Sequence, residues 1–391
     1  MSSRSFLTLL ILFLALYPLK LWVTPFTLAS QVIDLKGSPY QIGFQYGLKC
    51  KNKIVSLYCL VRGLSKQFFG VSAEELESLA EQVSPYIPPI YREEIKGLAN
   101  ATGLKYSEII VLNAFIDLAM YHALKTNSTP SFSCSQWIVV KDVDPETGPI
   151  YGRNLDFSLD FLLRNYQVVF RVKPDRGYPL IGHTIVGWIG VLTGINSEGL
   201  CVGVSLTEGL PDQISLEGVP LGILLRSALQ FNSTTREAVD YFASAPQTCS
   251  WNLGVLDAKG EAAIVEVTHL KRNVRWAFQV EPGEPAQGYK WICATNIFHS
   301  EEMRSYAAIS ESSVYRYKTL QKLLSEISVY TLEDAVKIAA SHYHWKAKSN
   351  NPSAKTLCRH GLASLEISGT LSCFIGIPKL KAALICLNSP C

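Results

Sequence analysis

The chain has 391 residues, of which 48% are hydrophobic and 18% are charged, and its formal net charge is +3. This composition excludes an intrinsically disordered protein, because enough apolar surface is present to fill a core. The length suits one large domain or two ordinary ones, and the lack of a long basic run argues against a nucleic-acid-binding protein.

The chain begins with a segment that does not belong to a globular fold. Arg4 precedes an apolar run over residues 6–16, which has the length of the core of a secretory signal peptide. Pro18 and Lys20 interrupt the run before it reaches the roughly 20 apolar residues that a membrane-spanning helix needs. We therefore expect residues 1–30 to be a signal peptide, with a membrane anchor as the alternative. Export predicts a secreted, periplasmic or lysosome-like lumenal location.

Residues 31–133 are predicted to be mainly helical. A short strand over residues 32–37 comes first, and helical spacing of apolar residues follows it. Pro88-Pro89 and Ser107-Glu108 mark the starts of later helices in this segment. We expect the segment to be structural.

The pattern changes to strands after this segment. Short runs rich in β-branched and aromatic residues predict strands over residues 137–141, 150–153, 166–172, 183–191, 199–206, 251–256, 262–268, 291–294, 370–377 and 382–387. Helices are predicted over residues 219–231, 234–243, 301–327 and 331–341. Hairpins dominate these strands, and no linker or repeat divides the chain. The sequence therefore predicts two mainly antiparallel sheets packed together with helices outside, an α+β fold.

Cys134 is the cysteine with the most distinctive surroundings. A polar run leads to Ser133 and Cys134, a strand-like run over 137–140 follows, and a turn at 144–149 returns the chain to residues 151–157. We interpret this as a hairpin that carries a nucleophile, with a cut before Cys134 that makes it a new N-terminus. The remaining cysteines are scattered, and most are expected to be core residues.

A cut between Ser133 and Cys134 would change the chemistry of the cysteine. An internal residue has an amide nitrogen, which is not a base, whereas the cut frees an α-amine with a pKa of about 7.7–8. That amine can take the proton of its own thiol, and the thiolate can form a thioester that water or an amine resolves. The same thiol can make the cut through a nitrogen-to-sulfur acyl shift. The alternative is that Cys134 is simply a buried strand cysteine.

Arg153 and Asp156 are predicted to return beside Cys134 on the second strand of the hairpin. Arg153 can stabilise a thiolate or hold a carboxylate, and Asp156 can accept a hydrogen bond from the α-ammonium or the thiol. Residues three apart on a flat strand face opposite sides, so both reach one site only if the chain leaves the strand near Asn154. A surface pair of charges is the alternative.

Other catalytic or metal-binding patterns are weak. There is no Gly-x-Ser-x-Gly, no phosphate-binding glycine loop and no His-Glu-x-x-His. His342 and His344 lack a nearby third ligand, so we expect a surface pair and predict neither a metal nor another cofactor. A catalytic Cys–His dyad is a further alternative, because its two members can be distant in sequence. His183 and His269 are the candidate histidines.

The motifs around Cys134 resemble those of a known family. Cys134-Ser135, a strand, a turn and then Gly152-Arg153-Asn154-Leu155-Asp156-Phe157 look like the N-terminal nucleophile hydrolases that cleave linear amides. These include the acyl-coenzyme A:6-aminopenicillanic acid acyltransferase family, the choloylglycine hydrolases and penicillin V acylases, and the acid ceramidase group. Similar motifs follow in order over roughly residues 32 to 391, at 37–47, 194–200, 294–298 and 389–391.

The resemblance implies a four-layer αββα fold and autoproteolysis before Cys134 into chains 31–133 and 134–391. It also implies that Arg153 and Asp156 lie in the site and that the side chain of Asn296 donates an N–H to the oxyanion, a type of donor worth about 3 kcal/mol elsewhere.

Three further positions are candidates by resemblance. Many relatives carry Asn where this chain has Ser205 to Glu208, which leaves the second oxyanion donor open between Ser205 and a backbone N–H near Leu206. Glu208 is a candidate because it matches a glutamate of the acid ceramidase group. Arg304 is a candidate for the arginine that follows the Thr-Asn motif.

The leading hypothesis is therefore an autoprocessed amidase or acyltransferase that acts on a small N-acyl amide through a Cys134 thioester. An exported, uncut binding or structural protein on the same fold is the alternative from another class. A Cys–His thiol hydrolase is the third. Association with a membrane is expected only through the N-terminal segment.

Overall fold

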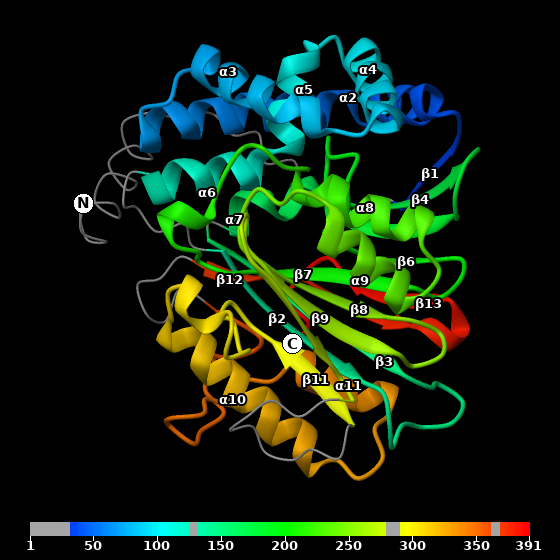
Figure 1. Ribbon diagram of the computed structural model, residues 1–391, viewed down its shortest axis with the longest axis vertical. Helices are drawn as coiled ribbons and strands as arrows, with labels where there is room; N and C mark the ends of the chain where they lie inside the picture. The colour runs from blue at the N-terminus through cyan, green and yellow to red at the C-terminus, as the bar shows by residue number, and fades with distance from the viewer. Residues whose placement is uncertain (1–31, 126–131, 159, 279–289, 361–367) are drawn as a thin grey trace. The chain divides into compact units, whose positions relative to one another are not determined.

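The computed structural model describes residues 32–125, 132–158, 160–278, 290–360 and 368–391. The predicted signal peptide lies outside the described residues. Within them, two β-sheets are covered by helices (Figure 1).

The larger sheet has eight strands in the order β1-β4-β5-β6-β7-β8-β9-β10. Its neighbouring strands are antiparallel, except that β1 runs parallel to β4. The strands are β1 (Val32–Gly37), β4 (Gln167–Pro174), β5 (Leu180–Ile185), β6 (Thr193–Asn196), β7 (Cys201–Leu206), β8 (Trp251–Leu256), β9 (Ala262–Val267) and β10 (Arg272–Trp276).

The smaller sheet has five antiparallel strands in the order β11-β2-β3-β12-β13. They are β11 (Trp291–Ala294), β2 (Phe132–Val139), β3 (Ile150–Ser158), β12 (Ser368–Ile377) and β13 (Ala382–Cys386). The predicted nucleophile hairpin is β2 and β3, at the centre of this sheet.

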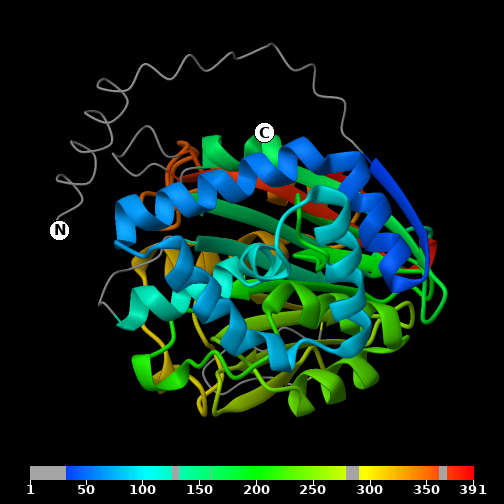
Figure 2. The same cartoon turned by 90° about the horizontal axis from the view of Figure 1, so that it is seen from above.

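Helices complete the four layers. Those of the N-terminal segment are α2 (Pro39–Leu64), α3 (Ala73–Val83), α4 (Pro89–Thr102), α5 (Tyr106–Asn113) and α6 (Phe115–Lys125); the others are α7 (Asp160–Leu163), α8 (Leu221–Phe231), α9 (Thr235–Ser244), α10 (Glu311–Glu326) and α11 (Leu332–Ala339). Helices α8 and α9 pack on the larger sheet, and α10 and α11 pack on the smaller one. Apolar side chains such as Tyr151, Ile195 and Phe374 form a core between the sheets. The predicted αββα arrangement is confirmed, and Figure 2 shows the N-terminal helices from above.

Several element predictions were wrong in extent, among them those for β2 and β3, which are longer than predicted. Two others have a clear local reason. The strand predicted over residues 183–191 ends at Ile185, because the chain turns at Gly187, whose φ of 87° is in the left-handed region. The helix predicted over residues 301–327 begins only at Glu311. The hydroxyl of Ser310 caps it by accepting the N–H of Ser313.

The motif at residues 37–47 is explained by the packing of α2 against α4. A Cβ at Gly43 would lie 1.9 Å from the carbonyl oxygen of Glu94, and one at Gly97 would lie 2.1 Å from that of Tyr40. Both contacts are with backbone, which cannot rotate away as a side chain can. Glycine therefore lets the two helices approach closely at this crossing.

We expect Gly43→Ala to lower the free energy of unfolding by about 1–3 kcal/mol, because the added methyl overpacks this crossing. Gly63→Ala is the matched control in the same helix, since nothing lies within 4 Å of its Cβ position. That change should raise the free energy by roughly 0.5–1 kcal/mol, as alanine does in an exposed helix. Urea unfolding of the two variants measures both values, and equal effects would contradict the close packing.

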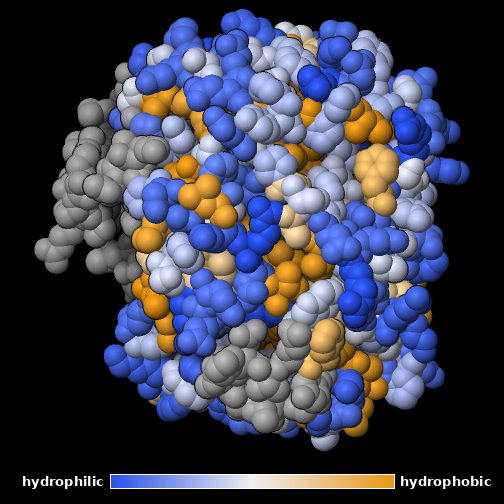
Figure 3. All heavy atoms as spheres, viewed as in Figure 1, coloured by the Kyte–Doolittle hydropathy of each residue, from blue (hydrophilic) through white to orange (hydrophobic). Residues whose placement is uncertain are grey.

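Among the described residues, no helix combines the length and the apolar character that crossing a membrane requires. The face shown in Figure 3 is mainly hydrophilic, and its apolar residues appear in separated groups.

Candidate active site

The β2–β3 hairpin places Cys134 among residues from both sheets. In its register Cys134 lies opposite Leu155, Gln136 opposite Arg153, and Ser133 opposite Asp156. Paired residues of antiparallel strands point to the same face. Cys134 and Arg153 therefore share the face of the small sheet that meets the large one. The Cys134 side chain is buried.

Arg153 is held rigidly at the thiol. Its Nη2 donates to Cys134 Sγ at 3.3 Å. Its Nε donates to the carbonyl oxygen of Val204 at 2.7 Å, and its Nη1 donates to Thr193 Oγ1 at 2.7 Å. Two strands of the large sheet thus fix the guanidinium, which places its positive charge beside the sulfur of Cys134.

Asn296 accepts a hydrogen bond from the backbone N–H of Cys134. Asn296 Oδ1 accepts this bond at 2.8 Å and a second one from Arg316 Nη2 at 2.8 Å, while its Nδ2 donates to the carbonyl oxygen of Leu206 at 2.7 Å. Because its partners are two donors and one acceptor, the amide has one satisfactory orientation. Asn252 Nδ2 fixes the loop by donating to the carbonyls of Thr295 and Ile297.

Arg316 is the residue that the sequence prediction missed. It lies on α10, fully buried, and donates to the carbonyl oxygen of Cys134, to Ser135 Oγ and to Asn296 Oδ1. Burial lowers the pKa of its guanidinium to about 10, so it stays charged at neutral pH. One signal was present in the sequence, because Arg316 shares a helix face with Leu320 and Leu324, at the i+4 and i+8 positions.

Asp156 lies close in sequence to Arg153 but on the other face of the sheet. Strand β3 continues to Ser158, so the chain does not leave the strand at Asn154, and alternation separates the two side chains. Asp156 Oδ1 accepts from Thr370 Oγ1 at 2.7 Å. Burial raises the pKa of its carboxyl, although the charges of Arg359 and Arg316 oppose this. In the uncut chain it is the neighbour of Ser133, on the face opposite the thiol.

The three further candidates lie outside the contacts of the thiol described above. Ser205 is buried in β7, where it pairs with Asn252 in the strand register. Glu208 is partly buried beyond the end of β7, and burial raises the pKa of its carboxyl. Arg304 is on an exposed turn, and its Nε donates to the carbonyl oxygen of His299. The arginine that reaches Cys134 after the Thr-Asn motif is Arg316.

The histidines proposed for a Cys–His dyad bind other groups. His183 Nε2 lies 3.0 Å from Gln167 Oε1, and His269 Nδ1 lies 2.8 Å from the carbonyl oxygen of Gln247. Burial and the charge of Arg153 lower the pKa of His183 to about 3, which makes it a poor base. The geometry therefore favours a base other than histidine at Cys134.

An apolar cavity of about 60 Å³ lies next to the nucleophile hairpin. Leu155, directly opposite Cys134 in the register, and Leu192, the neighbour of Thr193, both line it. The other walls are apolar side chains of α2, α6 and the segments around them: Leu57, Leu60, Val61, Leu64, Phe115, Ile116, Phe157, Leu162, Leu163, Ile185, Trp188 and Leu371. An aliphatic group bound here would contact Leu155, the strand partner of Cys134.

The motif at residues 194–200 has a structural explanation. Asn196 Nδ2 donates to the carbonyls of Leu229 and Asn232, and its Oδ1 accepts the N–H groups of Glu198 and Leu200. This asparagine closes the turn between β6 and β7. The turn positions the strands that carry Thr193 and Val204, the two anchors of Arg153.

Comparison with protein families gives one match, over residues 143–371, which is more than half of the chain. The matching family is described as acyl-coenzyme A:6-aminopenicillanic acid acyl-transferase. The matched range starts after Cys134, so the assignment of the nucleophile depends on the geometry above.

Curated proteins and solved structures are similar at low identity. An uncharacterized protein of Archaeoglobus fulgidus is 23% identical over 75% of this chain and 54% of its own length, so the chain spans about half of that relative. The N-acylethanolamine-hydrolyzing acid amidase of Oryctolagus cuniculus is 24% identical over 71% of this chain and 78% of its own. The structure of the Caenorhabditis elegans orthologue of that amidase aligns with a TM-score of 0.42 and 16% identity, over 63% of this chain and 93% of the other.

Proposed function

Because this chain belongs to the acyl-coenzyme A:6-aminopenicillanic acid acyl-transferase family, we propose that it cuts itself before Cys134 and then cleaves an N-acyl amide, or transfers its acyl group. The observation that carries this proposal is that both the thiol and the backbone nitrogen of Cys134 are hydrogen-bonded within the site, by Arg153 and Asn296 respectively. Arg153 contacts the thiol, and Asn296 Oδ1 contacts the backbone nitrogen that the cut would turn into an amine.

The cut begins with attack of Cys134 Sγ on the carbonyl carbon of Ser133. The carbon–nitrogen bond breaks, the nitrogen takes the thiol proton, and a thioester joins the Ser133 acyl group to the sulfur. Water then hydrolyses the thioester, which leaves a carboxylate on Ser133 and a free thiol and amine on Cys134. Arg153 stabilises the sulfur anion in the first step.

The same groups serve the reaction with substrate. The α-amine of Cys134 takes the thiol proton, the thiolate attacks the substrate carbonyl, and the ammonium returns the proton to the leaving amine. An amide nitrogen has two N–H groups, so Asn296 can donate one to the oxyanion while the other stays on Leu206. Water or an acceptor amine resolves the thioester.

Asp156 has a different part in this proposal. It is paired with Ser133 in the strand register, so departure of Ser133 after the cut uncovers its carboxylate beside the new N-terminus. There it can accept a hydrogen bond from the α-ammonium. Ser205 or a backbone N–H near Leu206 is a candidate for the second oxyanion donor. Glu208 is a further candidate site residue, and Arg304 has its own backbone partner on an exposed turn.

The apolar cavity favours an aliphatic acyl group as the acyl part of the substrate. Its lining is aliphatic and aromatic, and one of its residues, Leu155, is the partner of Cys134 in the strand register. The name of the rabbit relative describes a hydrolase of N-acylethanolamines, which is consistent with an N-acyl amide substrate. Residues 1–30, as a signal peptide, would deliver the enzyme to a lumenal or extracellular location.

We expect the purified chain to yield a fragment that starts at Cys134, and the cut protein to hydrolyse N-acyl amides. With one amine held constant, kcat/KM for a decanoyl amide should exceed that for an acetyl amide by about 100-fold. Three or four buried methylenes at about 0.8 kcal/mol each supply this ratio. N-terminal sequencing and amine release measure the two results.

The outcomes separate the competing functions. An intact chain without amidase activity would favour the binding protein. An intact chain that cleaves amides would favour an internal thiol nucleophile and exclude the N-terminal one. A cut chain that prefers the acetyl amide would support the nucleophile and reject the acyl cavity.

A further inference from the structure

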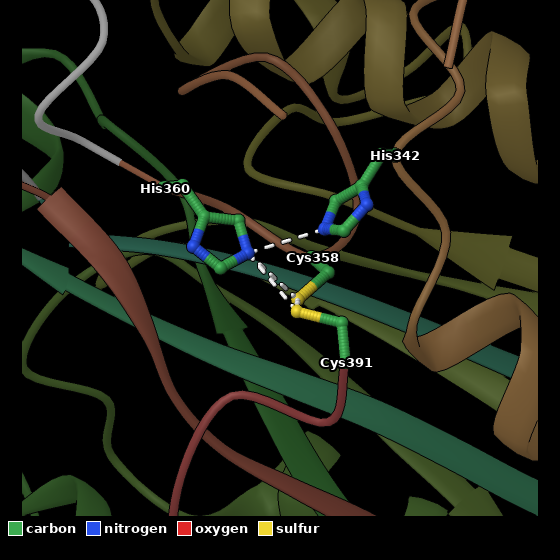
Figure 4. A group of neighbouring side chains, drawn as sticks. All are labelled: His342, Cys358, His360 and Cys391. Atoms are coloured by element: carbon green, nitrogen blue, oxygen red, sulfur yellow. Dashed lines mark hydrogen bonds between the residues drawn. The ribbon is translucent and has the colours of Figure 1, made fainter. Parts of the chain in front are cut away.

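Four side chains from three separate segments of the chain converge beyond helix α11 (Figure 4). His342 follows that helix, Cys358 and His360 flank Arg359, and Cys391 follows strand β13. One nitrogen or sulfur atom from each of the four lies within 4.8 Å of all the others. His360 Nε2 is 3.1 Å from His342 Nε2 and 3.0 Å from Cys391 Sγ, and the two sulfurs are 2.8 Å apart.

We propose that these four residues form a structural Zn²⁺ site. Two thiolates and two neutral imidazoles are a common ligand set for zinc, and four protein ligands make a closed, tetrahedral site. Figure 4 shows both imidazole rings and both sulfurs directed toward one point. The site is separate from the thiol of Cys134, and the inference does not depend on the proposed amidase activity.

The distances are close to those of a zinc site. Zinc–sulfur bonds of about 2.3 Å and zinc–nitrogen bonds of about 2.0–2.1 Å, arranged tetrahedrally, separate the ligand atoms by about 3.3–3.8 Å. The distance from Cys358 Sγ to His360 Nε2 is already 3.5 Å, and three other pairs must open by less than about 1 Å. The two sulfurs lie within 4.8 Å of the ligand atom of His342. Cys391 and the partly exposed histidines leave the cluster open to solvent, which gives an ion an entry path.

The same cluster connects to the outer face of the nucleophile hairpin. The carbonyl oxygen of Leu357, next to Cys358, accepts from Asn154 Nδ2 at 2.9 Å. The backbone N–H of Arg359, between two of the ligands, donates to Thr370 Oγ1, which in turn donates to Asp156. A metal ion here would pin this segment against β3 and β12.

The spacing of these four residues along the chain does not match a known zinc-binding motif, so the sequence did not predict the site. The predicted pair His342 and His344 does not act together: His344 Nδ1 accepts the backbone N–H of Ala347, and His344 lies against Tyr315. The partners of His342 come instead from Cys358 onward, in no zinc-finger spacing. The expectation of a surface histidine pair is therefore corrected for His342.

The competing state of the two sulfurs is a disulfide between Cys358 and Cys391. It would remove both thiolates and with them the metal site. The full-length chain, purified under reducing conditions without chelators, should contain about one zinc per chain by elemental mass spectrometry. Replacement by Co²⁺ should give the strong visible absorption of a tetrahedral sulfur-containing site. This spectrum is read on the unmodified protein, so it does not depend on the folding of any variant.

Substitution identifies the ligands. His342→Ala, Cys358→Ser and Cys391→Ser should each lower the affinity for Zn²⁺ by more than about 100-fold, beyond the 10–100-fold that a supporting contact costs. His344→Ala and Cys386→Ser are matched controls close in sequence, and they should keep full zinc content. The proposal is overturned if the reduced protein binds no Zn²⁺, if the ligand variants keep it, or if the native protein carries a Cys358–Cys391 disulfide and no zinc.

Discussion

The Cys134→Ala chain should remain in one piece and should lose amide cleavage by on the order of 10⁶-fold, the loss that removal of a hydrolase nucleophile produces. Both effects have one cause, since the same sulfur attacks Ser133 in the cut and the substrate in turnover. The methyl group of alanine cannot attack either carbonyl. A denaturing gel and amine release under saturating substrate measure the two losses.

Cys59→Ala is the control for this experiment, because Cys59 is an exposed cysteine of α2 far in sequence from the hairpin. It should be cut and active like the unmodified chain. Cys134→Ser tests the chemistry further, since a hydroxyl can replace the thiol in the cut more readily than in turnover. A Cys134→Ala chain that is still cut at this position would contradict the proposed self-cleavage.

Arg316→Ala should slow both the cut and amide turnover by about 100-fold or more, the effect expected when a reacting group is misplaced by about 1 Å. Arg316 donates to the carbonyl oxygen of Cys134 and to Asn296 Oδ1, so it positions the nucleophile and the oxyanion donor together. Its loss should lower kcat and leave KM nearly unchanged, because no contact with the acyl cavity is removed.

Arg316→Lys separates this positioning role from a general loss of stability. Lysine keeps the charge but lacks the planar fork that reaches several acceptors, so it should restore only part of kcat. Arg304→Ala, in the exposed turn before α10, is the matched control and should leave turnover within about twofold. If the Arg304 variant loses activity while the Arg316 variants keep it, the assignment of the distal arginine is wrong.

Local patterns were sufficient for most of the fold. Runs of β-branched and aromatic residues predicted most strands of both sheets but not β6 and β10. The capping pair Thr331 and Asp334 marks the start of α11, which was predicted. Such signals act over a few residues, which is why they can be read without knowledge of the rest of the chain. The strand predicted through Gly187 was wrong because one residue with a positive φ reverses the chain inside an apolar run.

The candidate active site could be predicted from the sequence only in part. Cys134 and Arg153 lie on one hairpin, so the pairing of two strands that are close in sequence brings them together. The motif resemblance added Asn296. Arg316 and Cys134 are 182 positions apart, and they meet because α10 packs on β2. Local sequence propensities do not predict that contact.

The sequence by itself determined the nucleophile hairpin, because Cys134, the turn and Arg153 are adjacent along the chain and strand pairing is set by short-range geometry. Only the tertiary structure decided which face Asp156 takes, which arginine reaches Cys134, and that Cys391 joins His342, Cys358 and His360. These contacts depend on how the two sheets pack against each other and on the path of the loops that cover them. Distances between side chains arise from that packing, so residues as far apart in sequence as Cys134 and Arg316 become neighbours without any periodic signal between them.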